Sequence, residues 1–339
     1  MKNLLAIIFL LAATHALQAQ ATAPEVAEAT RLSVQVVRLH DAGRYAEALP
    51  LAQKALELRE KALGPDHTDV AMAAYNLASV YFQLNQPAQA ESAGQRALQI
   101  YEKARVVPEE SLANLLFLLG GIGYTRADYE PAARHLQRAL ALREKISGAE
   151  HPATLDTVLL LAHVYHNNNQ YDSAEFLYRS YVAAQEKRGA RADNLGATLE
   201  RLSCVLWKKG ADEEASALEL RADSLLGYGI ATRTVKNKEL MANRLTRSSL
   251  DFQLDKKYVN QWPGLPGGII AVRVLINPQG EVRRACAING LPPLLPLYEA
   301  LTRSARFKPF VLNGQNAATV NGEINYQYEI ERRPNKPRP

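Results

Sequence analysis

Residues 43–71 read GRYAEALPLAQKALELREKALGPDHTDVA, and residues 126–156 read RADYEPAARHLQRALALREKISGAEHPATLD. Each stretch predicts an amphipathic helix, a turn and the start of a second helix, because apolar residues recur at three- and four-residue spacing. Segments of the same kind continue through the first two thirds of the chain. A unit of this length that recurs predicts stacked helix pairs.

The period is read from columns of small and large residues. One column holds Ala48, Ala90, Ala132, Ala174 and Ala215, at spacings of 42, 42, 42 and 41 residues. Small side chains at fixed points let neighbouring helices approach closely. Further columns keep the same period: Ala55, Ala97, Ala139, Tyr181 and Ala222; Leu77, Leu119, Leu161 and Leu202; and Val36, Ala78, Gly120, Ala162 and Ser203. The sequence therefore predicts five helix pairs over residues 27–227.

The segments ALELREKALGPDH and ALALREKISGAEHP, together with this period, resemble tetratricopeptide repeats of the kinesin light chain type. The resemblance covers about Ala27 to Leu226. It implies a superhelix whose inner wall is lined by the first helix of each pair. It also implies that an asparagine in the NLA motif holds a ligand backbone, and Asn76 is the residue that matches.

Candidate binding residues follow from counting through the units. One column is aromatic or imidazole in every unit, and neighbouring columns on the same wall add further rings. Two alternatives remain open: the rings form a groove for an extended or helical peptide segment, or they pack in the core. The predicted groove residues are His40, Tyr75, Asn76, Phe82, Phe117, Tyr124, His163, His166 and Trp207.

The pattern changes after Leu226. Residues 228–257 are expected to form a connector with a helix around Lys238 to Arg247. Two alternating segments, GGIIAVRVLIN and EVRRACAI, flank the turn PQG and predict a β-hairpin. LPPLLPLYEALTRSA then has helical spacing, and TVNGEINYQYEIE alternates as a final strand. The predicted order is strand, strand, helix, strand.

This order, with INPQGEV, RFKP and NGEINYQYEI, resembles the TonB C-terminal domain over about Tyr258 to Glu331. The resemblance implies that the last strand takes a segment of an outer-membrane transporter by strand addition. The alternative is that this strand only completes the sheet. The predicted edge residues are Val320, Ile324, Asn325, Tyr326, Gln327 and Tyr328.

The expected fold class is thus α + β multidomain: an all-α tetratricopeptide superhelix followed by a small α+β domain over residues 258–331. The basic, proline-rich tail at 332–339 is expected to be disordered. Residues 1–21 read as a signal peptide with a short apolar core, which predicts export to the periplasm or cell envelope. The alternative is an uncleaved inner-membrane anchor, which would suit a TonB-family energy transducer component for outer-membrane transport.

Composition and motifs narrow the function further. The net charge is +5, and 47% of residues are hydrophobic. No basic cluster is interleaved with aromatics, so nucleic acid is not an expected partner. No catalytic or phosphate-binding motif is present, so neither an enzyme nor a cofactor is predicted. The predicted partners are protein or peptide segments.

Histidines and cysteines carry the remaining expectations. His67 and His151 read as loop-capping residues. His163 and His166 share a helix face, but nothing completes a ligand set, so no metal site is predicted. Export permits a disulfide. Cys204 and Cys286 fall in different predicted domains, however, and two unpaired, half-buried thiols are expected.

Overall fold

The computed structural model describes residues 24–189, 191–227, 233–235, 268–276, 279–289, 302, 307, 311–312, 315–316 and 320–328. The chain forms two compact units, Met1–Val164 and Tyr165–Pro339. Among the described residues, no helix combines the length and the apolar character that crossing a membrane requires.

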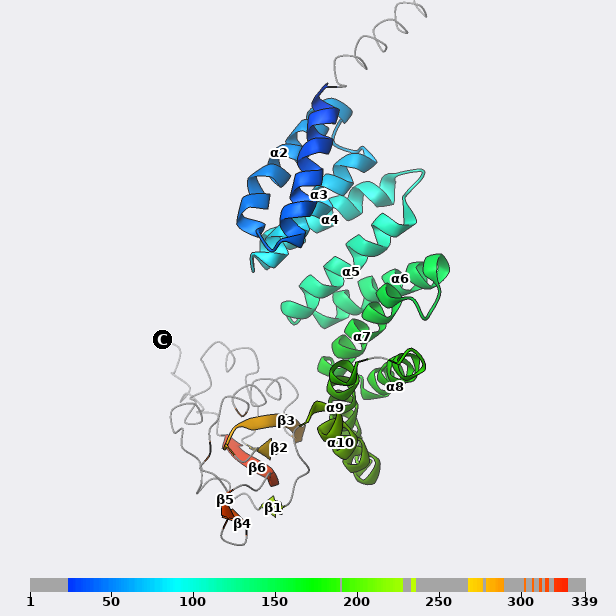
Figure 1. Cartoon of the computed structure of the whole chain (residues 1–339). Helices are drawn as coiled ribbons and strands as arrows, with labels where there is room; N and C mark the ends of the chain where they lie inside the picture. Colours follow the sequence, from blue (N-terminus) through cyan, green and yellow to red (C-terminus); the bar gives the residue numbers. More distant parts are fainter. Residues whose placement is uncertain are drawn as a thin grey trace, which may run out of the picture. The chain divides into compact units, whose positions relative to one another are not determined.

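Helices follow one another closely through both units (Figure 1). In the first unit, a helix at 24–41 precedes the others, and helices α2 to α5 each pack against the next helix along the chain. The bounds of the helices are α2 Tyr45–Leu63, α3 Thr68–Gln83, α4 Pro87–Lys103, α5 Glu109–Thr125, α6 Tyr129–Ser147, α7 Pro152–Asn167, α8 Tyr171–Lys187, α9 Ala192–Lys209 and α10 Asp212–Leu226.

The columns of small residues lie where the helices touch. The alanine column from Ala48 to Ala215 is 0% exposed at all five positions. At Gly120, a Cβ atom would lie 2.4 Å from Cγ of Leu136, so a larger residue there would force Leu136 to move. The buried column confirms the prediction of a repeated helix pair. Close approach of the helices buries the apolar faces that one pair alone would expose.

The turn inside each pair repeats as well. One residue per turn has a positive φ: Gly43 (70°), Asn85 (56°), Ala127 (61°), Asn169 (59°) and Gly210 (77°). Glycine and asparagine tolerate this left-handed conformation, whereas a Cβ atom makes it unfavourable for most residues. The turn residues therefore keep the period of the helices.

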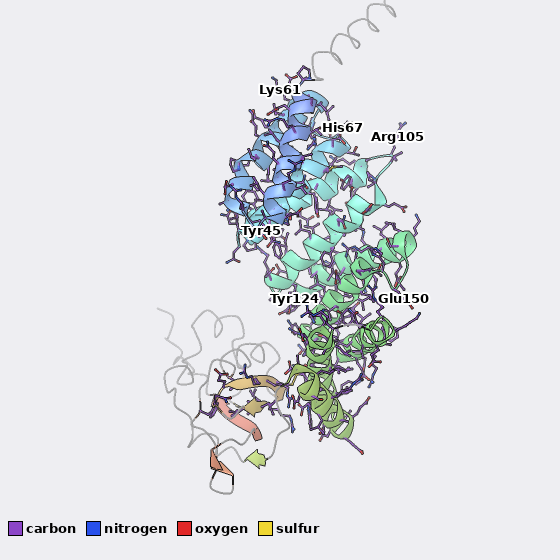
Figure 2. All side chains as sticks on the ribbon, in the orientation of Figure 1. Tyr45, Lys61, His67, Arg105, Tyr124 and Glu150 are labelled. Atoms are coloured by element: carbon purple, nitrogen blue, oxygen red, sulfur yellow. A yellow bond between two sulfur atoms is a disulfide. The ribbon has the colours of Figure 1, made fainter. Side chains whose placement is uncertain are left out.

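Two of the loops between pairs contain a histidine that caps the following helix. The backbone N–H of Asp69 donates to Nδ1 of His67 at 3.1 Å, and that of Ala153 donates to Nδ1 of His151 at 3.3 Å. His67 lies at the start of α3 (Figure 2). Because the first N–H groups of a helix have no partner within it, such caps stabilise the helix start. The loop-capping prediction is confirmed.

A sheet follows the helices in the second unit, with the strand order β1-β6-β2-β3. Strand β2 is antiparallel to both β3 and β6, whereas β1 runs parallel to β6. A separate antiparallel pair is formed by β4 and β5. The bounds are β1 Arg233–Val235, β2 Gly268–Ile276, β3 Val282–Asn289, β4 Val311–Leu312, β5 Gln315–Asn316 and β6 Val320–Tyr328.

The predicted hairpin is confirmed as β2 and β3, and the predicted final strand is β6. Strand β1 was not predicted; it lies in the segment expected to be a connector. The helix predicted around Lys238 to Arg247 lies outside the described residues, as does the helix predicted over 291–305, apart from Thr302.

The turn after β2 contacts a distant residue. Gly280 has a φ of 81°, and a Cβ atom there would lie 1.8 Å from the carbonyl oxygen of Phe307. The N–H of Phe307 donates to the carbonyl of Gly280 at 2.9 Å, and the Phe307 side chain is 1% exposed. The hairpin glycine and the phenylalanine of the RFKP segment are therefore packed together.

Candidate functional site

A cavity of about 590 Å³ opens in the first unit. It lies between the helix at 24–41 and helices α2, α3 and α5. Its lining residues are Thr30, Ser33, Val34, Val37, Arg38, Arg59, Met72, Tyr75, Asn76, Ser111 and Asn114. Three of the four helices are the first members of their pairs, which the sequence places on the inner wall.

The apolar part of the cavity is accessible to solvent. Val34, Val37 and Met72 are 47%, 48% and 38% exposed, which is high for large apolar side chains in a packed helical array. Exposed apolar side chains grouped around a concavity are typical of binding sites for apolar ligand groups.

The polar part comes mainly from α3 and α5. Tyr75 and Asn76 are adjacent on α3, and Ser111 and Asn114 are one turn apart on α5. Burial raises the pKa of Tyr75, although the nearby Arg143 opposes the shift, so this phenol stays protonated at neutral pH. Hydroxyl and amide groups of this kind can donate to, and accept from, a peptide backbone.

A buried cation completes the site. Arg59 comes from α2 and is only 6% exposed. Burial lowers the pKa of its guanidinium, and Asp69 opposes that shift through space. The sequence prediction missed this residue. Its signal was the recurrence of LREK at residues 58–61 and 142–145, which are two periods apart.

The predicted groove residues of the first unit are only partly gathered here. Tyr75 and Asn76 line the cavity, whereas the others lie elsewhere along the helices. Phe117 lies under the guanidinium of Arg143, with 4.4 Å from Cζ to the ring centroid. Phe82 packs against the hydrophobic core.

His40 and Tyr124 have other neighbours. Nε2 of His40 lies 3.1 Å from Oγ of Ser79, within hydrogen-bonding distance. The ring of Tyr124 lies 6.3 Å, centroid to centroid, from the rings of both Tyr129 and His163. Tyr124 is among the labelled side chains of Figure 2. The rings are thus distributed along the helices and do not form one pocket.

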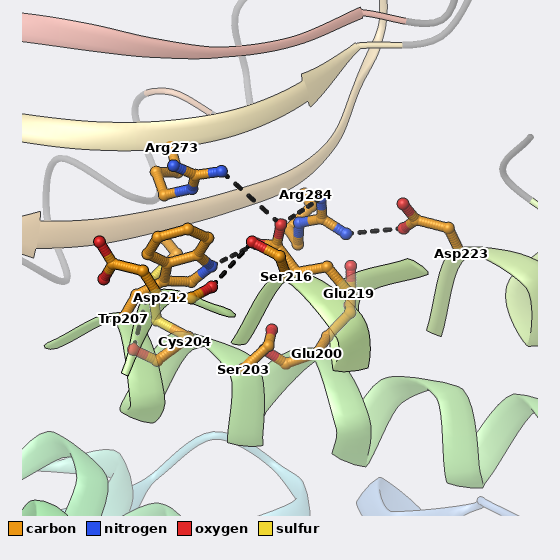
Figure 3. Close-up of polar contacts among 11 residues, drawn as sticks. Glu200, Ser203, Cys204, Trp207, Asp212, Ser216, Glu219, Asp223, Arg273 and Arg284 are labelled. Atoms are coloured by element: carbon orange, nitrogen blue, oxygen red, sulfur yellow. Dashed lines mark hydrogen bonds and ion pairs between the residues drawn. A yellow bond between two sulfur atoms is a disulfide. The ribbon is translucent and has the colours of Figure 1, made fainter. Parts of the chain in front are cut away.

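Two predicted groove residues of the second unit are not free for a ligand. His166 is 7% exposed and is packed beside Tyr171 and Tyr178. The guanidinium of Arg273, from β2, lies 3.5 Å above the Trp207 ring. The indole N–H of Trp207 donates to Glu219 at 2.8 Å (Figure 3). The prediction of an open groove is wrong at these two positions, because the chain's own residues cover them.

Helix α10 and the sheet are joined by buried ion pairs. Arg284, on β3, is 3% exposed, and its Nη1 lies 2.6 Å from Oδ1 of Asp223. Its Nη2 lies 3.4 Å from Oε2 of Glu219, which also pairs with Arg273 at 3.8 Å (Figure 3). Glu219, Asp223 and Arg284 are buried, whereas the Arg273 side chain is 22% exposed. These four residues are called the buried ion cluster below.

A disulfide reinforces this contact. Cys204, on α9, is bonded to Cys286, on β3, with 5.7 Å between their Cα atoms. The expectation of two unpaired thiols is therefore wrong. The cysteines are 82 residues apart in the chain, and the packing of β3 beside α9, which brings them together, left no local signal in the sequence.

Part of the predicted strand edge of β6 is already paired with another strand of the chain. Val320 faces Arg233 in a parallel pairing that continues only to Val235 and Gly322. This side of β6 is therefore already occupied at Val320. From Glu323 to Tyr328, the described residues contain no strand on that side of β6. Side-chain directions in β6 lie outside what the structure describes.

The part of the chain that the structure describes contains no candidate metal site. No group of three or more His, Cys, Asp or Glu residues there could hold an ion.

Comparison with known proteins identifies the helices. Residues 38–103 and 111–187 match the family model described as "Tetratricopeptide repeat". Nephrocystin-3 from Homo sapiens is 45% identical over 53 residues, a match that spans 16% of this chain and only 4% of nephrocystin-3.

Solved structures with similar folds include BtubC (BKLC) from P. vanneervenii, with a TM-score of 0.51 and 19% identity over 62% of this chain and 90% of that one. A putative kinesin light chain from Podosopora anserina with nearly identical TPR-like repeats gives a TM-score of 0.50 and 22% identity, over 58% of this chain and 93% of that one. At these identities the likeness concerns the fold alone.

Tetratricopeptide folds bind peptides or proteins, and the family is in general a non-enzymatic interaction scaffold. The buried columns, the period of the turns and the family match agree with one another. The chain therefore contains tetratricopeptide repeats, and its helical part is a tetratricopeptide fold.

Proposed function

We propose that this protein is a non-catalytic interaction protein of the cell envelope that binds a protein segment in the cavity of its first unit. The observation that carries the proposal is the cavity itself: about 590 Å³, lined by exposed apolar side chains and by hydroxyl and amide groups. The repeat family binds peptides or proteins, and the cavity has the composition that such binding needs.

The two halves of the cavity suit two parts of a peptide. Val34, Val37 and Met72 offer apolar surface to a side chain, whose burial contributes about 25 cal/mol per Å². Tyr75 and Asn76 offer hydrogen bonds to its backbone. Apolar contact then supplies most of the affinity, and the polar groups fix the orientation.

Capture of synthetic peptides tests the proposal. The immobilised full chain is offered an equimolar library of dodecapeptides, and the retained peptides are identified by mass spectrometry. We expect selective retention, reduced about fivefold to tenfold in Val37→Ser, because that variant loses apolar contact.

The matched control is Val106→Ser. Val106 is 81% exposed and does not line the cavity, so retention should not change. Circular dichroism should show equal helicity in all three proteins. Retention that is absent in the wild type, or reduced equally in both variants, would contradict the proposal.

Export to an oxidising compartment is the second part of the proposal. The disulfide between Cys204 and Cys286 supports it, because disulfides persist outside the reducing cytosol. The predicted signal peptide at 1–21 lies outside the described residues. Sequencing the mature amino terminus tests export: loss of about twenty residues supports a released protein, and their retention supports a membrane-anchored component.

Strand addition at β6 is a second candidate function, and it extends the TonB-like hypothesis. The favouring observation is that β1 pairs with β6 over only three residues. We place the candidate edge at Ile324 to Tyr328, excluding Val320, and the candidate partner is an extended segment such as that of an outer-membrane transporter. In the free protein, the backbone N–H groups of β6 that point to this edge should exchange hydrogen rapidly, unlike the N–H groups that pair with β2.

The exchange experiment has a clear outcome. Along β6, N–H groups that point to β2 should be protected, and alternate N–H groups should exchange fast. Uniform protection from Glu323 to Tyr328 would mean that the chain's own residues cover the edge, and the candidate would fail.

A further inference from the structure

The two ends of the disulfide have chemically different surroundings. Cys204 lies on α9 (Figure 3), and the imidazole of His166, from α7, approaches it, with 3.9 Å between Nε2 and Sγ. The ammonium of Lys208, one turn after Cys204 on α9, lies 3.3 Å from the same Nε2. Both Cys204 and His166 are buried, so this contact is largely removed from water.

The two nitrogen groups have defined roles. An ammonium group can only donate hydrogen bonds, so Nε2 of His166 is the acceptor, and the ring is neutral with its proton on Nδ1. The ammonium also lies 5.6 Å from the centroid of the Tyr171 ring, whose face attracts a cation. The Cys204 end of the bond therefore has a proton acceptor beside it and a positive charge next to that acceptor.

The other charged groups around α9 do not cancel this charge. Glu219 and Asp223, on α10, belong to the buried ion cluster and pair with Arg284. Glu200 lies one turn before Cys204 on α9 and is an acid that acts against the lysine. At Cys204, one acid thus opposes a cation and an imidazole that can take up a second proton.

The Cys286 end lacks a comparable pair of groups among the described residues. Cys286 is 1% exposed on β3. Arg284 is two residues earlier and shares its strand face, but its charge is balanced by Asp223 at 2.6 Å. Burial in apolar surroundings makes a thiol harder to ionise, whereas a nearby cation makes it easier. In the reduced protein, Cys204 should therefore become a thiolate more readily than Cys286.

We propose that Cys204 is the reactive thiol of the reduced protein, which reacts first with a disulfide oxidant before Cys286 completes the bond to the sheet. The oxidant is a low-molecular-weight disulfide, RS–SR, of the glutathione type. The Cys204 thiol passes its proton to Nε2 of His166, and the thiolate attacks one sulfur of the oxidant. The bond between the oxidant's sulfur atoms breaks, and the released RS⁻ takes up the proton from the imidazole.

The second step closes the bond. The sulfur of Cys286 attacks Sγ of Cys204, and the remaining RS⁻ leaves with the proton of the Cys286 thiol. Two thiols of the chain are oxidised and one disulfide of the oxidant is reduced. Cys204, His166 and Lys208 are positioned by the helices, whereas Cys286 arrives with β3. The bond therefore closes only after the sheet has reached α9.

A titration of single-cysteine chains tests this order. In the reduced full chain carrying Cys286→Ser, the ultraviolet absorbance of the Cys204 thiolate is followed against pH, after subtraction of the Cys204→Ser/Cys286→Ser chain. We expect a midpoint about one pH unit or more below the ordinary thiol value of about 8.5, because the lysine stabilises the thiolate. In Cys204→Ser, the Cys286 thiolate should form at about 8.5 or above. A Cys204 midpoint at or above that of Cys286 would overturn the inference.

A charge-matched pair of variants identifies the cause. In the Cys286→Ser chain, Lys208→Met should raise the Cys204 midpoint by about one pH unit. The control is Lys209→Met, which removes the same charge from the next residue. Its ammonium pairs with Asp172 and Glu175, on α8, so the midpoint should not change. Equal midpoints in the two lysine variants would overturn the role of Lys208.

Reaction with oxidised glutathione measures the reactivity itself. At about pH 6.5, mass spectrometry should show the mixed disulfide forming about threefold faster in Cys286→Ser than in Cys286→Ser/Lys208→Met. One pH unit changes the thiolate fraction about tenfold, and the lower nucleophilicity of a more acidic thiol offsets part of that gain. The same thiol is compared in both chains. Equal rates would contradict the proposed step.

Folding is checked in parallel. Circular dichroism of each reduced chain should show the helicity of the wild type at the temperature of measurement. If a single-cysteine chain unfolds, the reduced wild type is labelled with iodoacetamide at low pH instead, and the modified peptides are identified by mass spectrometry. Cys204 should be labelled first. Labelling of Cys286 ahead of Cys204 would overturn the inference.

Discussion

His135 is a histidine whose protonation the fold opposes. It lies on α6, and its Nδ1 is buried without a hydrogen-bond partner among the described residues. Burial lowers its pKa from the ordinary 6.5, Arg138 and Arg134 lower it further, and Glu102 opposes them. The folded chain therefore holds this proton less tightly than the unfolded chain does.

A pH dependence of stability follows. As the pH falls below about 6.5, the unfolded chain takes up a proton at His135 before the folded chain does, so the free energy of unfolding decreases. Above that pH the contribution is constant. Thermal unfolding of the full chain between pH 5 and 7.5 should show a smaller loss of stability at low pH in His135→Gln than in the wild type. Parallel curves for the two proteins would show that His135 is not responsible.

At the scale of elements, the helices could be predicted from the sequence because their pattern is periodic. Each helix pair repeats the contacts of the previous one, so the columns through Ala48 and Leu77 identified both the helices and their buried faces. The difference in hydrogen bonding between Arg59 and Arg143 had no such signal. It depends on the side chains of the neighbouring helices: Arg59 donates to Ser33 on the helix at 24–41, whereas Arg143 donates to Asn114 on α5 and to Thr157 on α7.

The contact of α10 with β3 was unpredictable for a related reason. It joins residues that are 61 positions apart in the chain, and only folding brings Arg284 beside Asp223. Likewise, the sequence placed Trp207 on the inner wall, but it could not show that Arg273 would cover the ring.

The buried ion cluster should be sensitive to the loss of a single member. Arg284→Met leaves Asp223 buried without its nearest cation, and this should cost about 3–5 kcal/mol of unfolding free energy. The double variant Arg284→Met/Asp223→Leu should recover most of that loss, because it removes the unpaired charge as well. Denaturant unfolding of the two single variants and the double variant measures the coupling. Losses that simply add would show that the pair is not coupled.

At the scale of the whole molecule, the disulfide links the sheet covalently to the helices of the second unit. Cys204 and Cys286 are both buried, at 6% and 1% exposure, so a reductant can reach the bond only after the packing around it opens. A bond placed in this way suits a structural link that persists in an oxidising compartment.

Removing the link should destabilise the second unit strongly. The bond closes a loop of 82 residues, for which the loss of chain entropy in the unfolded state corresponds to roughly 4.5 kcal/mol. Thermal unfolding of the full chain should therefore show a lower melting transition in Cys204→Ser/Cys286→Ser than in the oxidised wild type. Dithiothreitol should lower the wild-type transition towards that of the variant and leave the variant unchanged. Because the ion cluster joins the same elements without the bond, the sheet of the variant should still fold at low temperature. Unfolding that is identical with and without the bond would mean that packing and the ion cluster alone hold the sheet in place.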